Sequence, residues 1–412
     1  MARELSNRPS ELYGPLEVAR HVKDDGRALI LYSRARADAG ADADADGDAD
    51  GVADGAAAAE SEPGAGSGPT EPSLSGQTGR HSLRKGAEAG YRSDRGLGER
   101  PRTGQRFDEL RGEQVVYAID RQERTFLPPA DHCPLCPTQP GGAPTEIPFA
   151  HFEIAVFDNR FPALRAPHGA AEVVVYTDGH EGSLGTLSPP RARALMWVWR
   201  HRYLELGAHA EVEYVMAFEN RGVEVGVTLH HPHGQIYAYP FLPPVPGNEL
   251  QADARLGGCA QCRLLARELN DGVRVVFENE AIVVYVPFAA RWAYEAHVVM
   301  RTHRPSLLDC EPRELDGLAS GLQALVRGYD ALFDRPFPYV MAVHQAPSDG
   351  RARGHVHVEF YPPLRTATKL KYLAGSEQGA GTFISDTLPE ESAPVLRAAI
   401  ERADGDGVDG RR

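Results

Sequence analysis

The sequence predicts an α+β protein in which one unit is duplicated, with an antiparallel sheet and flanking helices. Two Cys-x-x-Cys pairs stand at corresponding points of the folded region, and each is followed much later by an alternating His-x-His motif. Between these motifs, apolar patterns typical of strands and helices recur in the same order. Similarity in one element could arise by chance, but the same order of six elements indicates a duplication.

The first half begins near the first cysteine pair and gives strand patterns on either side of one helix. Ser188 is suited to cap that helix, and Pro189 is suited to its first turn. The expected elements are strands at 152–156 and 173–176, a helix from 188 to about 203, and strands at 214–218 and 231–237.

The second half repeats this order. Leu315, Leu318, Leu322 and Leu325 recur at helical spacing, which predicts an amphipathic helix. The strand sequence YVMAV after this helix nearly repeats the YVMAF of the first half. The expected elements are strands at 282–286 and 297–300, a helix over 315–332, and strands at 339–343 and 355–361.

Composition divides the chain into five segments. One of them is rich in Ala, Gly, Asp and Ser and almost lacks aliphatic and aromatic residues, so it cannot offset its own ordering entropy. The expected segments are an ordered N-terminal segment (1–35), a disordered acidic and Ala/Gly-rich insertion (36–100), a first unit (101–248), a second unit (249–390) and a C-terminal tail (391–412).

Bulk properties exclude several classes of partner. The chain has 412 residues and a formal net charge of −14, which argues against nucleic-acid or anionic-membrane binding because such partners need a basic face. No stretch approaches the roughly 20 apolar residues of a membrane helix, and no secretory signal is visible. We therefore expect a cytoplasmic protein, in which Cys-x-x-Cys pairs are more often metal or redox sites than disulfides.

The cysteines and histidines have the spacing of two metal sites. Thiolates and imidazoles suit a tetrahedral divalent ion such as zinc. His180 and His231 are 51 positions apart in the first half, and His303 and His355 are 52 apart in the second. The predicted sets are Cys133, Cys136, His180 and His231 for a first zinc, and Cys259, Cys262, His303 and His355 for a second metal, zinc or iron. Glu249, His344, His357 and Glu359 form a competing set for the second metal.

The first His-x-His motif also predicts a reactive site. On a strand, alternation would place His231, His233 and Gln235 on one face and His230 on the other. The alternative is a pair of surface histidines on an edge strand, which Pro232 would permit. The nearby metal spacing favours a functional site.

Several motifs together resemble the galactose-1-phosphate uridylyltransferases of the histidine-triad superfamily. They are CPLC, FDNRFPAL, FENRG, HHPHGQIYAYPFLPP and FYPPL, and the resemblance spans about 106–377. It implies two histidine-triad-like units, the first with the nucleophile. His233 would become uridylylated, Gln235 would bind the phosphoryl oxygens, and the first cysteine–histidine set would be structural zinc. Residues implied to contact nucleotide and phosphate are Arg121, Arg124, Asn159, Asn220 and Thr228, and those near the hexose are Lys371 and Glu377.

The resemblance implies transfer of UMP between UDP-glucose and galactose 1-phosphate, giving UDP-galactose and glucose 1-phosphate, by a homodimer. Two other functions remain open. One is a related phosphorylase or adenylyltransferase acting on ADP-glucose or a diadenosine polyphosphate. The other is a non-catalytic, metal-stabilised nucleotide-binding protein. No Walker A motif and no convincing Gly-rich dinucleotide loop occur, which argues against kinases and dehydrogenases.

Overall fold

The computed structural model of the chain describes residues 10–35, 103–124, 126–351 and 353–409. The predicted insertion at 36–100 lies outside these residues. None of the helices in the described part of the chain is long and apolar enough to span a bilayer.

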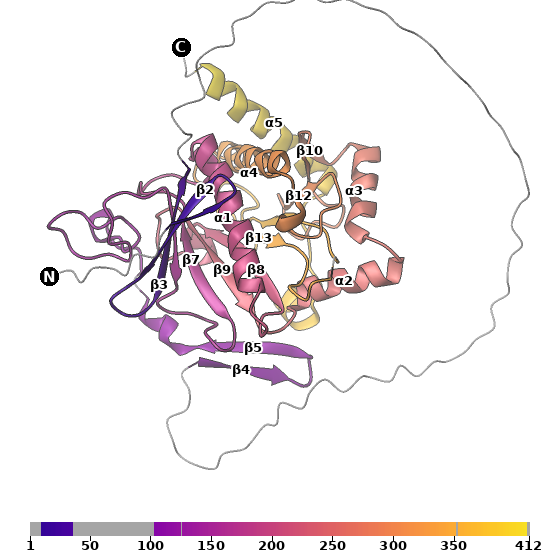
Figure 1. The fold of residues 1–412 in the computed structure, drawn as a ribbon. Helices are drawn as coiled ribbons and strands as arrows, with labels where there is room; N and C mark the ends of the chain where they lie inside the picture. The colour runs from indigo at the N-terminus through magenta and orange to yellow at the C-terminus, as the bar shows by residue number, and fades with distance from the viewer. Residues whose placement is uncertain (1–9, 36–102, 125, 352, 410–412) are drawn as a thin grey trace, which may run out of the picture. The chain divides into compact units, whose positions relative to one another are not determined.

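One twelve-stranded sheet organises the described residues (Figure 1). All neighbouring strands in it are antiparallel. From one edge to the other the order is β1 (Glu11–Tyr13), β2 (Leu16–Val22), β3 (Ala28–Arg34), β6 (Ile154–Asp158), β7 (Ala170–Val175), β9 (His233–Tyr239), β8 (Tyr214–Arg221), β13 (Tyr339–His344), β14 (His357–Tyr361), β12 (Ala296–Met300), β11 (Ile282–Tyr285) and β10 (Val275–Glu278).

The strand order confirms the duplicated unit. Reading outward from the central pair β8 and β13, one side runs β8, β9, β7, β6 and the other runs β13, β14, β12, β11. Each half therefore places its strands in the same relative positions, and the halves join where Glu219 lies opposite Met341. The predicted α+β class with an antiparallel sheet is confirmed, and predicted strand ends differ from the observed ones by no more than three residues.

Two equivalent helices pack on the sheet, α1 (Pro189–Gly207) and α4 (Pro312–Leu332) (Figure 1). Their apolar side chains and those of the sheet form the main hydrophobic core. Leu315, Leu318, Leu322 and Leu325 are each 1% exposed or less, as expected for the buried stripe of an amphipathic helix. The helix α1 begins with proline as predicted, although the Ser188 side chain makes no capping hydrogen bond.

The remaining α-helices of the described residues all follow strand β9 in the chain. They are α2 (Pro244–Leu256), α3 (Ala260–Asp271) and α5 (Pro389–Asp409). The last one occupies the segment that the sequence analysis expected as a tail. Leu396 and Ile400 are fully or almost fully buried, and a Cβ at Gly328 of α4 would lie 2.3 Å from Ile400. This close approach of α4 and α5 explains why a helix with few apolar residues is held in place.

A separate hairpin of β4 (Thr103–Asp108) and β5 (Glu113–Ala118) stands at the start of the first unit. It continues into a short 3₁₀ helix, Ile119–Glu123. Arg121 lies on this helix and Arg124 directly follows it. The hairpin and the helix therefore place both predicted arginines close together.

Candidate active site

The first His-x-His motif lies where the chain enters strand β9. The strand begins at His233, so His231 belongs to the preceding turn rather than to the strand. The expectation that His231 shares a strand face with His233 and Gln235 is therefore wrong for His231, whereas His233 and Gln235 do line one pocket. The turn aims the His231 ring toward the cysteines instead.

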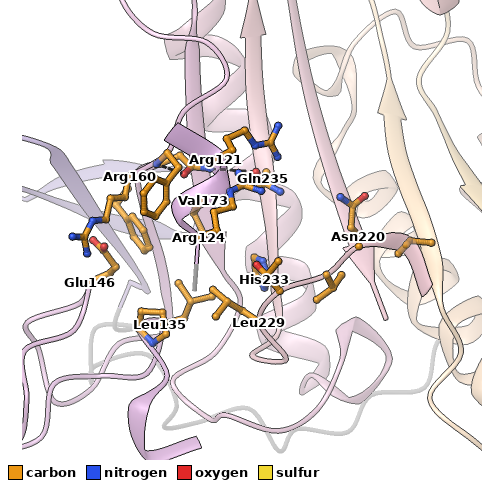
Figure 2. A pocket seen from close by; sticks show the side chains of 18 residues that line it. Arg121, Arg124, Leu135, Glu146, Arg160, Val173, Asn220, Leu229, His233 and Gln235 are labelled. Atoms are coloured by element: carbon orange, nitrogen blue, oxygen red, sulfur yellow. Dashed lines mark hydrogen bonds between the residues drawn. The ribbon is translucent and has the colours of Figure 1, made fainter. Parts of the chain in front are cut away.

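The pocket collects the predicted nucleotide-binding residues from four separate parts of the first unit. It has a volume of about 290 Å³. Figure 2 shows Arg121, Arg124 and Gln235 above the His233 ring, with Asn220 on one side of it. Its lining includes all seven residues predicted for catalysis and for nucleotide or phosphate contacts: Arg121, Arg124, Asn159, Asn220, Thr228, His233 and Gln235.

His233 is held with one specific ring nitrogen available. Its Nδ1 lies 2.7 Å from the carbonyl oxygen of His231, and since a carbonyl only accepts, Nδ1 must carry the proton. Burial, and to a smaller extent the charge of Arg124, lowers the pKa of His233. The neutral ring therefore presents the lone pair of Nε2, which is the form that a nucleophile requires.

Gln235 is oriented by its neighbour Asn159. The Asn159 side-chain amide donates to Gln235 Oε1 over 3.3 Å. This contact engages the carbonyl end of Gln235 and leaves its NH₂ group as a donor. A neutral donor beside His233 is suited to stabilise charge on a phosphoryl oxygen.

Gly234 is required by close packing rather than by an unusual backbone angle. A Cβ at this position would lie 2.2 Å from the Tyr176 hydroxyl oxygen and 2.9 Å from the Phe218 carbonyl oxygen. Strand β9 can therefore approach β8 and Tyr176 at this point only because residue 234 has no side chain.

The first cysteine–histidine set converges as predicted. Cys136 Sγ lies 3.3 Å from His180 Nδ1 and 3.5 Å from His231 Nδ1, and the Cys133 Sγ to His231 Nδ1 distance is 3.9 Å. Tetrahedral zinc with ordinary bond lengths would separate sulfur and nitrogen ligands by about 3.6 Å. His231 Nε2 donates to Thr177 O over 2.8 Å, which leaves Nδ1 unprotonated and facing the sulfurs. These four residues fit a tetrahedral metal ion.

The second cysteine–histidine set has the same geometry. Cys262 Sγ lies 3.5 Å from His303 Nδ1 and 3.3 Å from His355 Nδ1, and Cys259 Sγ lies 3.6 Å from His355 Nδ1. His355 Nε2 donates to Met300 O over 2.9 Å, as His231 does to Thr177. The ligand atoms of each set lie within 4.8 Å of one another.

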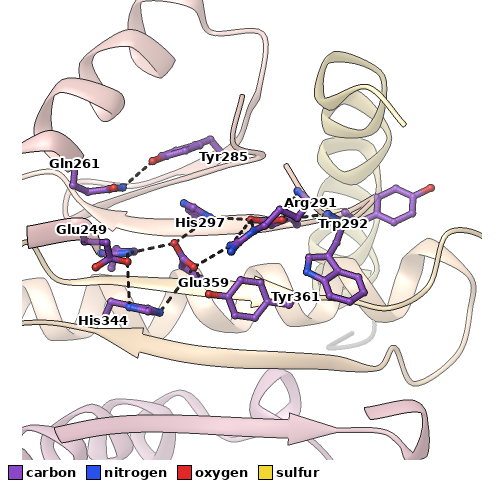
Figure 3. A network of polar contacts seen from close by, with 12 residues as sticks. Glu249, Gln261, Tyr285, Arg291, Trp292, His297, His344, Glu359 and Tyr361 are labelled. Atoms are coloured by element: carbon purple, nitrogen blue, oxygen red, sulfur yellow. Dashed lines mark hydrogen bonds and ion pairs between the residues drawn. The ribbon is translucent and has the colours of Figure 1, made fainter. Parts of the chain in front are cut away.

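The competing set for the second metal forms a polar network of its own (Figure 3), and the ligand atoms of Glu249, His344 and His357 also lie within 4.8 Å of one another. His344 Nδ1 lies 3.3 Å from Glu249 Oε1, and His357 Nε2 lies 3.5 Å from Glu359 Oε1. His297 Nε2 lies 3.4 Å from the same Glu359 oxygen. His355 does not take part, because its Nδ1 faces the cysteines.

Comparisons with known proteins decide the family. Sequence models of the N-terminal and C-terminal domains of galactose-1-phosphate uridyl transferase match residues 165–243 and 248–404. A galactose-1-phosphate uridylyltransferase from Thermotoga maritima is 35% identical over 322 residues, which cover 71% of this chain and 97% of the relative. The chain belongs to the galactose-1-phosphate uridylyltransferase family. It is therefore a nucleotidyltransferase by family.

Further relatives and solved structures are similar to this chain in the same way. A galactose-1-phosphate uridylyltransferase from Streptomyces lividans is 40% identical over 250 residues, covering 59% of this chain and 70% of the relative. A solved uridylyltransferase structure shares 30% identity with a TM-score of 0.64, covering 72% of this chain and 98% of that one. An ADP-glucose phosphorylase from Arabidopsis thaliana has a TM-score of 0.57 at 22% identity, covering 72% and 98%, and shares the fold.

The second unit of this uridylyltransferase family member carries a different set of charges at the position of the pocket. His357 and Glu359 occupy in β14 the places that His233 and Gln235 occupy in β9. Against the effect of burial, hydrogen bonds to Glu249 and Glu359 raise the pKa of His357. A protonated ring has no lone pair, and carboxylates beside it repel phosphate. Of the two units, the first therefore has the environment that suits a nucleophile.

Two predicted residues of the uridylyltransferase pattern lie away from the pocket. Lys371 Nζ lies 3.5 Å from Glu377 Oε1 and also contacts the carbonyl oxygen of Ile384. Both side chains are buried within their own C-terminal segment, and neither lines the pocket around His233.

The pocket also contains residues to which the sequence analysis gave no role. Leu135 lies between the first two cysteines, and Phe157 and Arg160 belong to the FDNRFPAL motif, in which only Asn159 was singled out. Glu146 lies in a loop without any motif. The FDNRFPAL motif could have indicated Phe157 and Arg160, but no local signal indicates Glu146.

Proposed function

We propose that the protein transfers UMP between UDP-glucose and galactose 1-phosphate through a uridylyl-histidine intermediate on His233. One observation carries the proposal: His233 presents an unprotonated Nε2 to a pocket that also contains Gln235 and two arginines. A nucleophile beside donors for a phosphoryl group is the arrangement that covalent nucleotidyl transfer needs.

In the first step, His233 Nε2 attacks the α-phosphorus of UDP-glucose. A nitrogen–phosphorus bond forms, the bond from phosphorus to the bridging oxygen breaks, and glucose 1-phosphate leaves with the electron pair. The ring becomes cationic, and its Nδ1–H remains bonded to the His231 carbonyl oxygen, which stabilises that charge. Arg121 and Arg124 offset the negative charge of the phosphoryl oxygens.

In the second step, a phosphate oxygen of galactose 1-phosphate attacks the same phosphorus and the nitrogen–phosphorus bond breaks. UDP-galactose leaves and His233 returns to its neutral form. The attacking phosphate is already anionic, so no further general base is required. Two steps at one nucleotide site explain how the same pocket can serve both sugar phosphates.

We propose that zinc occupies both cysteine–histidine sets and that its role is structural. The support is the match of the sulfur–nitrogen distances in both sets to tetrahedral geometry. Bound zinc would cross-link each loop to the sheet. Thiols must stay reduced to bind it, which suits the proposed cytoplasmic location.

The proposal predicts a covalent adduct with UDP-glucose in the absence of an acceptor. We expect the intact mass of the protein to rise by one uridylyl group and to return to its starting value when galactose 1-phosphate is added. ADP-glucose should give at least about tenfold less adduct, because the proposal assigns a uridine nucleotide to the pocket. Preferential labelling by ADP-glucose would instead support the adenylyltransferase alternative, and no labelling by either donor would contradict a stable covalent step.

We further propose a homodimer in which the C-terminal segment that Lys371 and Glu377 hold together completes the site of the other copy. Both lie outside their own pocket, and the same segment exposes Tyr372 and Ile384, which are 75% and 61% exposed. Light scattering should give twice the 44.8 kDa chain mass. Co-expressed His233→Ala and Lys371→Ala chains should recover about a quarter of wild-type activity, since half the dimers would have one intact site. A monomer, or no recovery, would contradict the shared site.

A further inference from the structure

Glu146 is an acidic residue in a pocket proposed to bind a polyanion. Figure 2 shows it with Arg160 at one end of the pocket, away from His233 and Asn220. Its side chain is 11% exposed, so it is largely enclosed by the pocket wall. A carboxylate near the phosphates would repel them, so its place at the far end calls for a different role.

The Glu146 carboxylate is held in a fixed orientation. Arg27 Nη2 lies 2.7 Å from Glu146 Oε2, and the ammonium group of Lys23 contacts the same oxygen. Arg27 is itself fixed through its Nη1, which donates to Asp158 O over 3.0 Å. Among the described residues, both of these cations use Oε2, which leaves Oε1 as an acceptor.

The Glu146 backbone is fixed as well. Its N–H donates to Pro134 O over 2.9 Å, and Pro134 lies between the two cysteines of the first metal set. Thr138 N donates to Ile147 O over 2.9 Å, so the chain on either side of Glu146 is tied to the cysteine loop. The carboxylate is therefore preorganised before any ligand binds.

The surroundings of Glu146 fit the base of a nucleotide. His233 and the arginines define the phosphate end, and a base is the part of a nucleotide furthest from its phosphates. Leu135 and Phe157 line the pocket and provide apolar surface for a planar ring. Uracil presents one N–H, at N3, between two carbonyl oxygens, and Arg160 supplies a donor at the same end for a carbonyl oxygen.

We propose that Glu146 determines base specificity by accepting a hydrogen bond at Oε1 from the N3–H of the uracil ring. This inference rests on the proposed uridine nucleotide site. In this proposal Lys23 and Arg27 orient the acceptor oxygen of Glu146. The loop of the first cysteine pair then helps to position a residue that recognises the base.

Calorimetric binding of UDP and of N3-methyl-UDP tests the proposal without requiring transfer. Wild-type protein should bind UDP about 10- to 100-fold more tightly than the methylated ligand, which lacks the donor. Glu146→Ala should weaken UDP binding by a similar factor and leave N3-methyl-UDP nearly unchanged, so the discrimination should disappear. Glu146→Gln keeps an acceptor oxygen and should retain part of the discrimination.

Thr138→Val is the matched control, because it removes a hydroxyl that holds the loop of Glu146, by accepting from Thr145 N over 3.0 Å, but keeps the carboxylate and both of its cations. It should retain most of the discrimination between the two ligands. Equal loss in Thr138→Val and Glu146→Ala, or full discrimination in Glu146→Ala, would show that Glu146 only holds the loop and would overturn the inference. If the wild-type protein forms the uridylyl adduct but the variants give either of these two results, this inference alone fails. If it binds no UDP and forms no adduct, the proposed function fails with it.

Discussion

Replacing His233 with alanine is expected to abolish uridylyl transfer, lowering kcat by at least about four orders of magnitude, as loss of a covalent nucleophile does. The fold should survive, because the His233 ring is only partly buried and its Nδ1 bonds to a backbone carbonyl of the same chain segment. Release of glucose 1-phosphate and the intact mass after incubation with UDP-glucose are the measurements.

His230→Ala is the matched control for this substitution. His230 lies three positions earlier and is exposed, and it lies outside the pocket that His233 shares with Gln235 and the arginines, although it lines a neighbouring cavity with His233. It should keep near-normal transfer and form the adduct. A uridylyl adduct on the His233→Ala protein would assign the nucleophile to another residue, and unchanged turnover would favour a non-catalytic binding protein.

The order of the elements and the pocket around His233 could be predicted because their signals are local in sequence. Strand β8, the following loop and strand β9 form one continuous stretch, which brings Asn220, Thr228, His233 and Gln235 together, and the family resemblance of the motifs in this stretch supplied their expected roles. Hydrophobic periodicity gave the helix α4 for the same reason. Local patterns suffice where neighbours in sequence are also neighbours in the pocket.

Other features depend on contacts between distant residues. Glu146 lies in a loop without periodicity, and its orientation depends on Lys23 and Arg27, which are 123 and 119 positions away. The direction of the His355 ring, whose Nδ1 faces the second cysteine pair, depends on a hydrogen bond to Met300 in β12. The sequence alone does not predict the orientation of Glu146 or of the His355 ring, because contacts between distant residues determine both.

The prediction that His231 shares a strand face with His233 was wrong for a related reason. The rule applies only within a strand, and β9 begins two residues later. His231 is instead positioned by Thr177 and the cysteines, so its ring belongs to the metal set while that of His233 faces the nucleotide pocket. One short motif thus serves two sites, with opposite ring nitrogens available in the two histidines.

Loss of the first metal is expected to have the largest effect on stability. Structural zinc can contribute on the order of 10 kcal/mol to folding. Cys136→Ser should lower the zinc content from two equivalents per chain to one and lower the Tm by roughly 10 °C or more. The measurements are metal analysis of the purified protein and thermal unfolding. Cys310→Ser is the control, since Cys310 is buried outside both sets and should leave both equivalents bound.

The two metal sets should differ in their effect on nucleotide binding. Pro134 and Leu135 lie between the first cysteines and line the pocket, so Cys136→Ser should weaken UDP binding by about tenfold or more as this wall loosens. Cys262→Ser should also remove one zinc, but its loop contributes nothing to that pocket, so UDP binding by the folded fraction should change little. Equal weakening in both variants would show that the metals act on the pocket only through global stability.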